Sequence, residues 1–269
     1  MPNCKQCLQV FEISENDRQF YKKIDVPEPT LCPACRQQRR LAFRNEFCLY
    51  HRKSDLSGKQ MISVYSPDKK FKVYTKDEWW SDQWDPLEYG RVFDFSRPFF
   101  GQLEELMKIV PRPAILNRNS ENSDYTNICE DNKNCYLLVE SSTNEDCLYG
   151  YWMQKSKNCV DCSYCSACEL CYECDNCENS YNLRFSQNCR DCSDSYFLKN
   201  CYGCKDCFGC VNLRQKQFYI FNKPCSEEEY RNRMAEMNFA SSHEVARIKD
   251  IYNKFKKTQI HKFAEIDTS

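Results

Sequence analysis

Four cysteines near the start of this chain have the types and spacing of a structural metal site. Cys4 and Cys7 form one C-x-x-C pair, and Cys32 and Cys35 form a second. Two thiolates two residues apart can hold one side of a tetrahedral ion at about 2.3 Å, and a second pair completes a closed site with no open position for water. We therefore predict one zinc ion at these four residues, because an unmetallated cluster would leave the surrounding segment too little core to hold its shape.

The residues around these pairs follow a recognisable order. F-E-I is followed by F-Y, then by P-E-P-T-L-C, and the second pair ends in C-R. This order resembles the probable zinc-binding treble-clef family, and the resemblance implies zinc at the four cysteines. Between the pairs we expect a hairpin with a polar turn at residues 14–18.

Basic residues gather near the second pair and predict a basic helix that grows from it. Such a helix could bind the phosphates of a nucleic acid. A run of basic residues is also typical of a helix face that is only exposed to solvent. Both interpretations stay open. The candidate nucleic-acid residues are Lys22, Lys23, Arg36, Arg39, Arg40 and Arg44.

Sixteen of the 22 cysteines lie between residues 129 and 210, and every gap between them is a multiple of three. When the stretch is written in rows of twelve residues, two columns contain small or apolar residues only. The residue before each column is usually Asn or Asp, which tolerate a left-handed backbone. The first column holds Cys135, Cys147, Cys159, Cys171, Leu183, Ser195 and Cys207. The second holds Cys129, Ser141, Met153, Cys165, Cys177, Cys189, Cys201, Leu213 and Cys225.

This register excludes a helix, because at 3.6 residues per turn a three-residue stripe drifts around the cylinder. A β-solenoid keeps it, since coils stacked about 4.8 Å apart turn each column into a ladder of like residues. We predict eight or nine coils of twelve residues, or half as many of twice that length. The fold class is mainly β, with treble-clef or zinc-ribbon modules first and capping helices at the C-terminus.

The solenoid cysteines are interpreted first as packed thiols, because they recur along the whole stack and alternate with Ser, Leu and Met. Further zinc in the densest part, Cys159 to Cys177, is the second interpretation, and disulfides or an iron–sulfur cluster the third.

A second ribbon follows the first site, with serine where ligands are expected. Ser54 and Ser57 stand in S-x-x-S-G-K, the outline of a C-x-x-C-G-K knuckle, and residues 75–78 take the place of its partner. We expect a metal-free hairpin of strands 61–65 and 71–74 joined at residues 66–68. After it we expect a packed aromatic core from Trp79 to Phe100 and a helix that Ser96 caps.

Two helices are expected after the last coil. Ser226 with Glu229 forms a capping box, and Ser242 starts a second helix with one apolar stripe. Open solenoid ends expose strand edges, so covering the last coil is the expected role, with partner binding as the alternative.

Composition excludes a strong charge field, since 38 basic residues balance 39 acidic ones. The start of the chain has no signal-peptide pattern and no long apolar run occurs, so we expect a cytoplasmic protein without a membrane partner. Only three histidines occur, none in a nucleophile pattern, and we identify no catalytic residue and no small-molecule substrate.

The whole layout, including C-P-A-C-R-Q-Q-R-R-L, W-W-S-D-Q-W-D-P and a late N-L-R-Q-K, resembles uncharacterised bacterial proteins described only as containing a zinc ribbon. We expect domains at 1–50, 51–116, 117–224 and 225–269. The function that follows is a zinc-binding, non-catalytic scaffold that presents a rigid surface to protein or nucleic acid. The alternative is a redox enzyme that uses the thiols or a metal cluster of Cys159 to Cys177.

Overall fold

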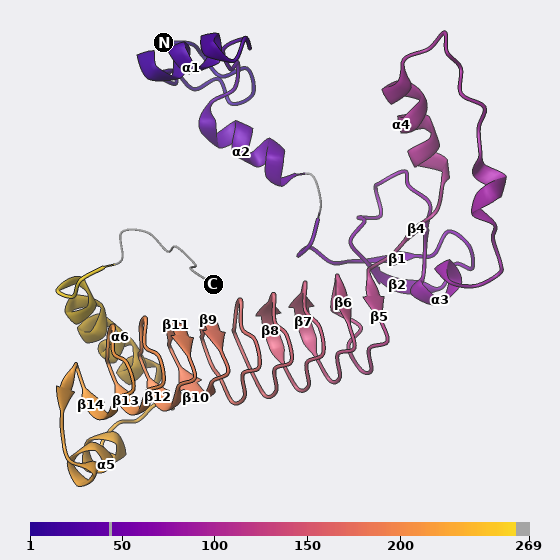
Figure 1. Ribbon diagram of the computed structural model, residues 1–269. Helices are drawn as coiled ribbons and strands as arrows, with labels where there is room; N and C mark the ends of the chain where they lie inside the picture. The colour runs from indigo at the N-terminus through magenta and orange to yellow at the C-terminus, as the bar shows by residue number, and fades with distance from the viewer. Residues whose placement is uncertain (43–44, 262–269) are drawn as a thin grey trace. The chain divides into compact units, whose positions relative to one another are not determined.

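The computed structural model describes residues 1–42 and 45–261. Within it the chain forms two compact units, Met1–Cys48 and Leu49–Ser269. The element labels below are those of Figure 1.

The first unit contains two helices, α1 (Glu15–Lys23) and α2 (Pro33–Leu41). The expected hairpin is therefore wrong, because the polar segment taken as its turn starts α1. The Ser14 hydroxyl accepts from the N–H of Asp17, and the Asp17 carboxylate accepts from the Ser14 N–H. This reciprocal cap satisfies donors that a helix leaves unpaired at its N-terminus.

The second unit opens with an antiparallel pair, β1 (Tyr50–Lys53) and β2 (Gln60–Ser63), around the turn 54–59. The expected hairpin at 66–68 is wrong, since β3 (Val73–Tyr74) pairs in parallel with β4 (Arg112–Pro113) instead. The carboxylate of Asp55 accepts from the N–H of Val73 at 2.8 Å and draws β3 to the turn.

Three short elements separate β3 from β4: α3 (Lys76–Trp79), η1 (Pro86–Tyr89) and α4 (Phe99–Ile109). Trp84 contacts the rings of Tyr74, Trp79 and Tyr89, so the first half of the expected aromatic core forms. The second half does not, because Phe95 is 93% exposed. The expected Ser96 cap is also wrong, because α4 begins after Pro98 with no side-chain cap.

From residue 117 the chain winds into about nine coils of about twelve residues, which Figure 1 shows as one stack. Strand and bridge partners are parallel and twelve residues apart, as in Cys177 with Cys189, so the longer coil is excluded. The strands are β5 (Asn117–Arg118), β6 (Cys129–Glu130), β7 (Tyr136–Val139), β8 (Leu148–Tyr151), β9 (Asp175–Glu178), β10 (Tyr181–Arg184), β11 (Gln187–Arg190), β12 (Ser193–Tyr196), β13 (Lys205–Phe208) and β14 (Gln217–Ile220).

A left-handed residue recurs at nearly every third position from Asn119 to Phe221 and has φ near +50°. Each is a corner, so a coil has four sides of three residues, and the residue after each corner points inward. Asn and Asp occupy many corners, as expected, because they tolerate this conformation better than other residues with a side chain.

Four inner columns result, and the sequence columns starting at Cys135 and Cys129 are two of them. A third runs from Leu138 through Gly150 to Cys210, and a fourth from Asn132 through Ser156 to Cys204. All sixteen cysteines between residues 129 and 210 are buried. The core of the solenoid is therefore built mainly of thiols, hydroxyls and small apolar groups.

The last coil is covered as expected only in part, by a returning strand and by the first of the two C-terminal helices, whereas the second helix packs along earlier coils. After β14 the chain turns back into the antiparallel strand β15 (Lys223–Pro224), so Cys225 leaves the inner column assigned to it from the sequence. Helices α5 (Glu227–Ala235) and α6 (Ser242–Lys257) follow, and Figure 1 shows α6 against the final coils. Ile248 and Tyr252 of α6 are buried against Phe197 and Phe208.

Among the described residues, no helix has the length and apolar character needed to cross a lipid bilayer.

Candidate metal centre

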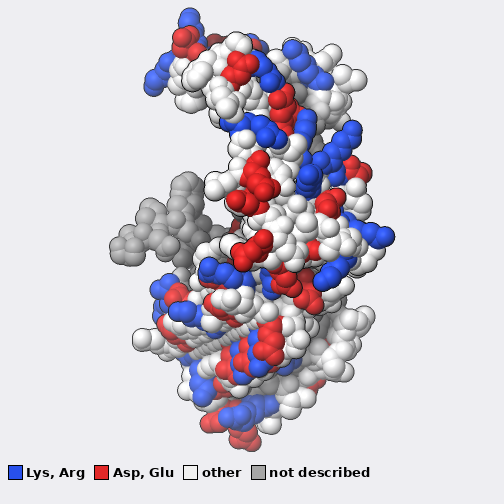
Figure 2. Space-filling model, turned by 90° about the vertical axis from the view of Figure 1, so that its right-hand side faces the viewer, with Lys and Arg blue, Asp and Glu red and all other residues white. Residues whose placement is uncertain are grey.

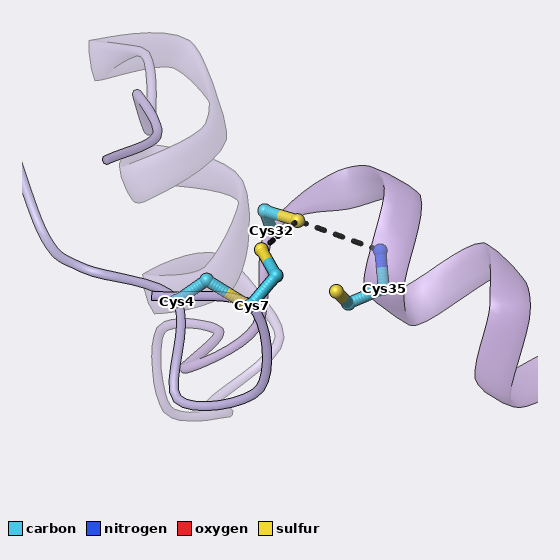
Figure 3. Close-up of side chains that lie close together, drawn as sticks. All are labelled: Cys4, Cys7, Cys32 and Cys35. Atoms are coloured by element: carbon cyan, nitrogen blue, oxygen red, sulfur yellow. Dashed lines mark hydrogen bonds between the residues drawn. The ribbon is translucent and has the colours of Figure 1, made fainter. Parts of the chain in front are cut away.

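The structure brings the Sγ atoms of Cys4, Cys7, Cys32 and Cys35 to within 4.8 Å of one another. In Figure 3 the four side chains converge, two from the loop before α1 and two from the start of α2. The Sγ atoms of Cys7 and Cys32 are 3.8 Å apart. Tetrahedral coordination with bonds of about 2.3 Å separates ligand sulfurs by about 3.8 Å, so the donor set fits a metal ion.

Local hydrogen bonds hold the first pair in a tight knuckle. The N–H of Cys4 donates to the carbonyl of Gln9 at 2.9 Å, and the N–H of Leu8 donates to the carbonyl of Cys4 at 3.0 Å. Leu8 has a φ of 62°, the left-handed conformation that closes the turn. The second pair is held by α2 itself, because the Cys35 N–H donates to the Cys32 Sγ at 3.4 Å.

The electrostatics of the four thiols also favour a cation. The backbone N–H of Cys7 lowers the pKa of Cys4 to about 6, whereas burial and the neighbouring thiols raise the pKa of Cys35 to about 12. Four thiolates so close repel one another, and a divalent cation between them removes that repulsion.

The serine ribbon repeats the first knuckle in its backbone. The N–H of Ser54 donates to the carbonyl of Lys59 at 2.8 Å, and the N–H of Gly58 donates to the carbonyl of Ser54 at 3.0 Å. Gly58 has a φ of +75° and corresponds to Leu8 of the first knuckle. Ser54 and Ser57 thus stand where Cys4 and Cys7 stand.

The second half of the ribbon matches as well. Thr75 is the N-cap of α3 as Cys32 is the N-cap of α2, and its hydroxyl accepts from the Glu78 N–H at 3.2 Å. The Ser54 hydroxyl donates to the carboxylate of Glu78, which is 7% exposed. A hydrogen-bonded carboxylate therefore lies among the positions that correspond to the four cysteines of the first unit.

Burial by itself would raise the pKa of Glu78, but hydrogen bonds from Ser54 and Thr75 outweigh it and bring the pKa to about 2. Glu78 is an anion at neutral pH. Its hydrogen bonds stabilise the metal-free ribbon as a structural element.

The proposed nucleic-acid residues are only partly free. Lys22 and Lys23 end α1 and are exposed, as are Arg39 and Arg40 in the last turn of α2. Arg36 is used internally, where its guanidinium donates to the Tyr21 hydroxyl at 3.0 Å. Arg44 lies outside the described residues.

The solenoid thiols form no second ligand cluster. Among the described residues, the four N-terminal cysteines are the one set of three or more Cys, His, Asp or Glu ligand atoms within 4.8 Å of one another. No cysteine is in a disulfide. These findings favour packed thiols over zinc in the stretch from Cys159 to Cys177.

Inner hydroxyls and thiols also satisfy the backbone. The Ser141 hydroxyl donates to the carbonyl of Val139 at 2.9 Å and accepts from the N–H of Met153, one coil on, at 3.0 Å. The thiol of Cys192 accepts from the N–H of Cys204 at 3.4 Å in the same way. A coil with three-residue sides aims N–H groups inward, and Ser and Cys are small residues that both donate and accept.

The sequence reasoning missed the other two inner columns. Asn132 and Asn144 stack in one of them, with the amide of Asn144 donating to that of Asn132 at 2.9 Å. The three-residue spacing of the cysteines indicates all four columns. Asn132 and Asn144 obscured one of them, because polar side chains are not expected in a core.

The chain matches no protein-family model and no curated protein.

Proposed function

We propose that this protein binds one structural zinc ion through Cys4, Cys7, Cys32 and Cys35 and serves as a non-catalytic scaffold. The observation that carries the proposal is the four-sulfur cluster, in which Cys4, Cys32 and Cys35 are buried and Cys7 is exposed. Four thiolates are the donor set that zinc takes in structural sites, and they leave no position for a reacting water.

The solenoid supports a scaffold role through its rigidity. Its inward residues are used for packing, and its outward residues repeat every twelve positions, so side chains on one face lie in fixed rows. The thiols from Cys159 to Cys177 are at most 1% exposed, which leaves the alternative redox chemistry without access to a substrate.

A protein partner suits the outer surface of the first coils. Tyr136 and Tyr149 are 40% and 50% exposed with ring centroids 5.7 Å apart, and Trp152 lies 5.9 Å from Tyr164. Aromatic residues held rigidly cost little entropy on binding and are enriched at protein interfaces. In Figure 2 acidic and basic side chains are interspersed, and no broad basic field of the kind that attracts nucleic acid stands out.

Metal analysis tests the zinc site. Protein purified without added metal is expected to hold one zinc per chain, and Cys32→Ser is expected to lose it, with Cys48→Ser as the control because Cys48 lies outside the cluster. Iron with sulfide, or no metal at all, would refute the zinc assignment.

Comparative affinity capture tests the recognition surface. The wild type is expected to retain at least one protein that the double variant Tyr149→Ser/Trp152→Ser does not, whereas Tyr181→Ser, an exposed tyrosine further along the stack, retains it. Identical retained proteins for all three would contradict the proposed surface.

Nucleic acid is the second candidate partner, favoured by the exposed Arg39 and Arg40 of α2. Replacing both by Glu is expected to weaken retention on a nucleic-acid column. Unchanged retention, or none by the wild type, removes this candidate.

A further inference from the structure

Four phenylalanines form a connected cluster on the surface of the second unit. The ring centroids of Phe93 and Phe95 are 4.9 Å apart, and those of Phe93 and Phe99 are 6.2 Å apart. Phe99 continues the cluster to Phe100 at 5.4 Å. In chain order the four residues are 41%, 93%, 55% and 79% exposed, and the neighbouring Val92 is 96% exposed. A contiguous apolar patch of this kind marks an interaction site, because water disfavours it. We call these four residues the Phe cluster.

The helix that carries half of the Phe cluster also lacks a covering surface. None of the eleven residues of α4 is buried, and no side chain caps its N-terminus. A helix of this length is marginal in water by itself, and helices in proteins gain most of their stability by packing an apolar face. The described residues leave all of α4 at least partly exposed, so a further surface that covers it would stabilise it.

Hydrogen bonds hold the Phe cluster in one arrangement. The side-chain amide of Gln102 accepts from the N–H of Asp94 at 2.9 Å and donates to the carbonyls of Asp94 and Arg97 at 2.9 Å and 3.1 Å. A residue of α4 therefore fixes the segment that presents Phe95. A patch that is ordered before binding loses little conformational entropy when it docks.

The charges around the Phe cluster are balanced. Residues 91–109 contain three basic and three acidic side chains. Two of the basic side chains are paired within the segment, Arg97 with Glu105 and Lys108 with Glu104. A neutral surface does not attract nucleic acid or an anionic membrane, and two copies of it do not repel each other.

The ring geometry makes the Phe cluster complementary to itself. Phe93 and Phe95 meet at 86°, and Phe99 and Phe100 meet at 73°, so neighbouring rings are turned edge to face. The exposed surface therefore includes ring faces, which carry partial negative charge, and ring edges, which carry partial positive charge. Two copies of the cluster can place faces against edges.

The exposed area is sufficient for a stable contact between two copies. A buried phenylalanine contributes roughly 150–250 Å². With their exposed fractions, the four rings of the Phe cluster leave roughly 400–650 Å² per copy, on the order of 1,000 Å² for two copies. A specific interface needs about 1,000 Å², and exposed Val92 and Met107 add to the area.

We propose that this protein forms a symmetric dimer in which the Phe cluster and α4 of one copy pack against the same surface of a second copy. This inference goes beyond the proposed function, since it concerns the assembly of the chain and not its zinc site or its solenoid. A twofold contact uses one surface on both copies, so the assembly closes at two chains.

Sedimentation velocity of the full-length, zinc-loaded protein over a concentration series tests the dimer. Reducing conditions keep exposed Cys7 and Cys48 from linking copies covalently. The wild type is expected to sediment as two chains. Phe95→Asp and Phe95→Lys should each raise the dissociation constant about a hundredfold, because an interface hot spot contributes about tenfold or more and a symmetric dimer loses it twice.

An equimolar mixture of Phe95→Asp and Phe95→Lys keeps the test independent of folding defects. Opposite charges then meet within the Phe cluster, and the mixture should dimerise at least about tenfold more tightly than either variant alone. Ile260→Asp is the matched control, because Ile260 is 85% exposed and lies outside the cluster, and its dimer should equal that of the wild type.

Three results would overturn the proposal. A wild type that is monomeric at every concentration would mean that another protein or another part of the same chain covers the Phe cluster. An equal dissociation constant for the wild type and Phe95→Asp would place the contact elsewhere. A mixture that dimerises no better than its two components would show that the clusters do not face each other.

Discussion

The hydroxyl of Ser54 donates a hydrogen bond to the buried carboxylate of Glu78. These residues occupy the positions that Cys4 and Cys35 hold in the first unit, within the same knuckle and the same helix start. The negatively charged carboxylate of Glu78 thus lies in the second unit at the position where the first unit has one of its four sulfurs. The relationship makes the second ribbon a counterpart of the first site in which hydroxyls and a carboxylate stand at the sulfur positions.

The carboxylate makes the stability of the second unit depend on pH. The folded state lowers the pKa of Glu78 from 4.5 to about 2, so its stabilisation is complete above about pH 5 and is lost as the pH falls toward 2. Glu78→Gln is expected to lower the free energy of unfolding at pH 7 and to flatten its decline below pH 5. Urea unfolding across this range measures both, with the exposed Asp77→Asn as control. An unchanged slope for Glu78→Gln would contradict the assignment.

The shared backbone also predicts that the second ribbon can be converted into a metal site. The quadruple variant Ser54→Cys/Ser57→Cys/Thr75→Cys/Glu78→Cys places four thiols on a framework shaped like the first site, and we expect a second zinc per chain by elemental analysis. The triple variant that keeps Glu78 is the control. It should bind the second zinc more weakly, because a carboxylate is a harder ligand than a thiolate. No added zinc in the quadruple variant would show that the two frameworks differ.

Gly150 is expected to be intolerant of a side chain. A Cβ at this position would lie 2.2 Å from the Sδ of Met153 and 2.8 Å from Cδ2 of Leu138, and both neighbours are fully buried. Gly150→Ala should lower the free energy of unfolding by about 1–3 kcal/mol, the usual cost of overpacking.

The double variant Gly150→Ala/Met153→Ala tests that reason, because the shorter side chain frees the space. Its loss of stability in urea should be smaller than the sum of the two single losses. If the loss of the double variant equals the sum of the two single losses, Met153 is not the side chain that excludes a Cβ at residue 150.

Inner cysteines should tolerate serine better than leucine. Cys168 stands between Ser156 and Ser180 in one column, and its N–H donates to the Ser156 hydroxyl at 3.3 Å. Cys168→Ser keeps size and hydrogen bonding, so we expect a change below about 1 kcal/mol, whereas Cys168→Leu should cost about 1–3 kcal/mol. Chemical denaturation under reducing conditions measures the two variants. If serine costs as much as leucine, the thiols have a role beyond filling the column.

The features that local repetition encodes could be predicted from the order of residues alone. The pairs at Cys4 and Cys32 implied a four-sulfur site, and the three-residue grid implied a coil, because corner residues such as Asn134 and the small residue after each recur with the backbone geometry. The helix capped by Ser226 and the helix that starts at Ser242 also follow from local patterns, although the N-cap of the second is Ser241.

Tertiary structure decided what depends on contacts between distant residues. The pairing of β3 with β4 joins Val73 to Arg112, and no local pattern specifies so remote a partner. The contact of Phe197 with Tyr252 likewise requires α6 to fold back onto the coils. Propensity and periodicity act over a few residues, whereas the choice among distant partners is made by burial and charge in the whole folded unit.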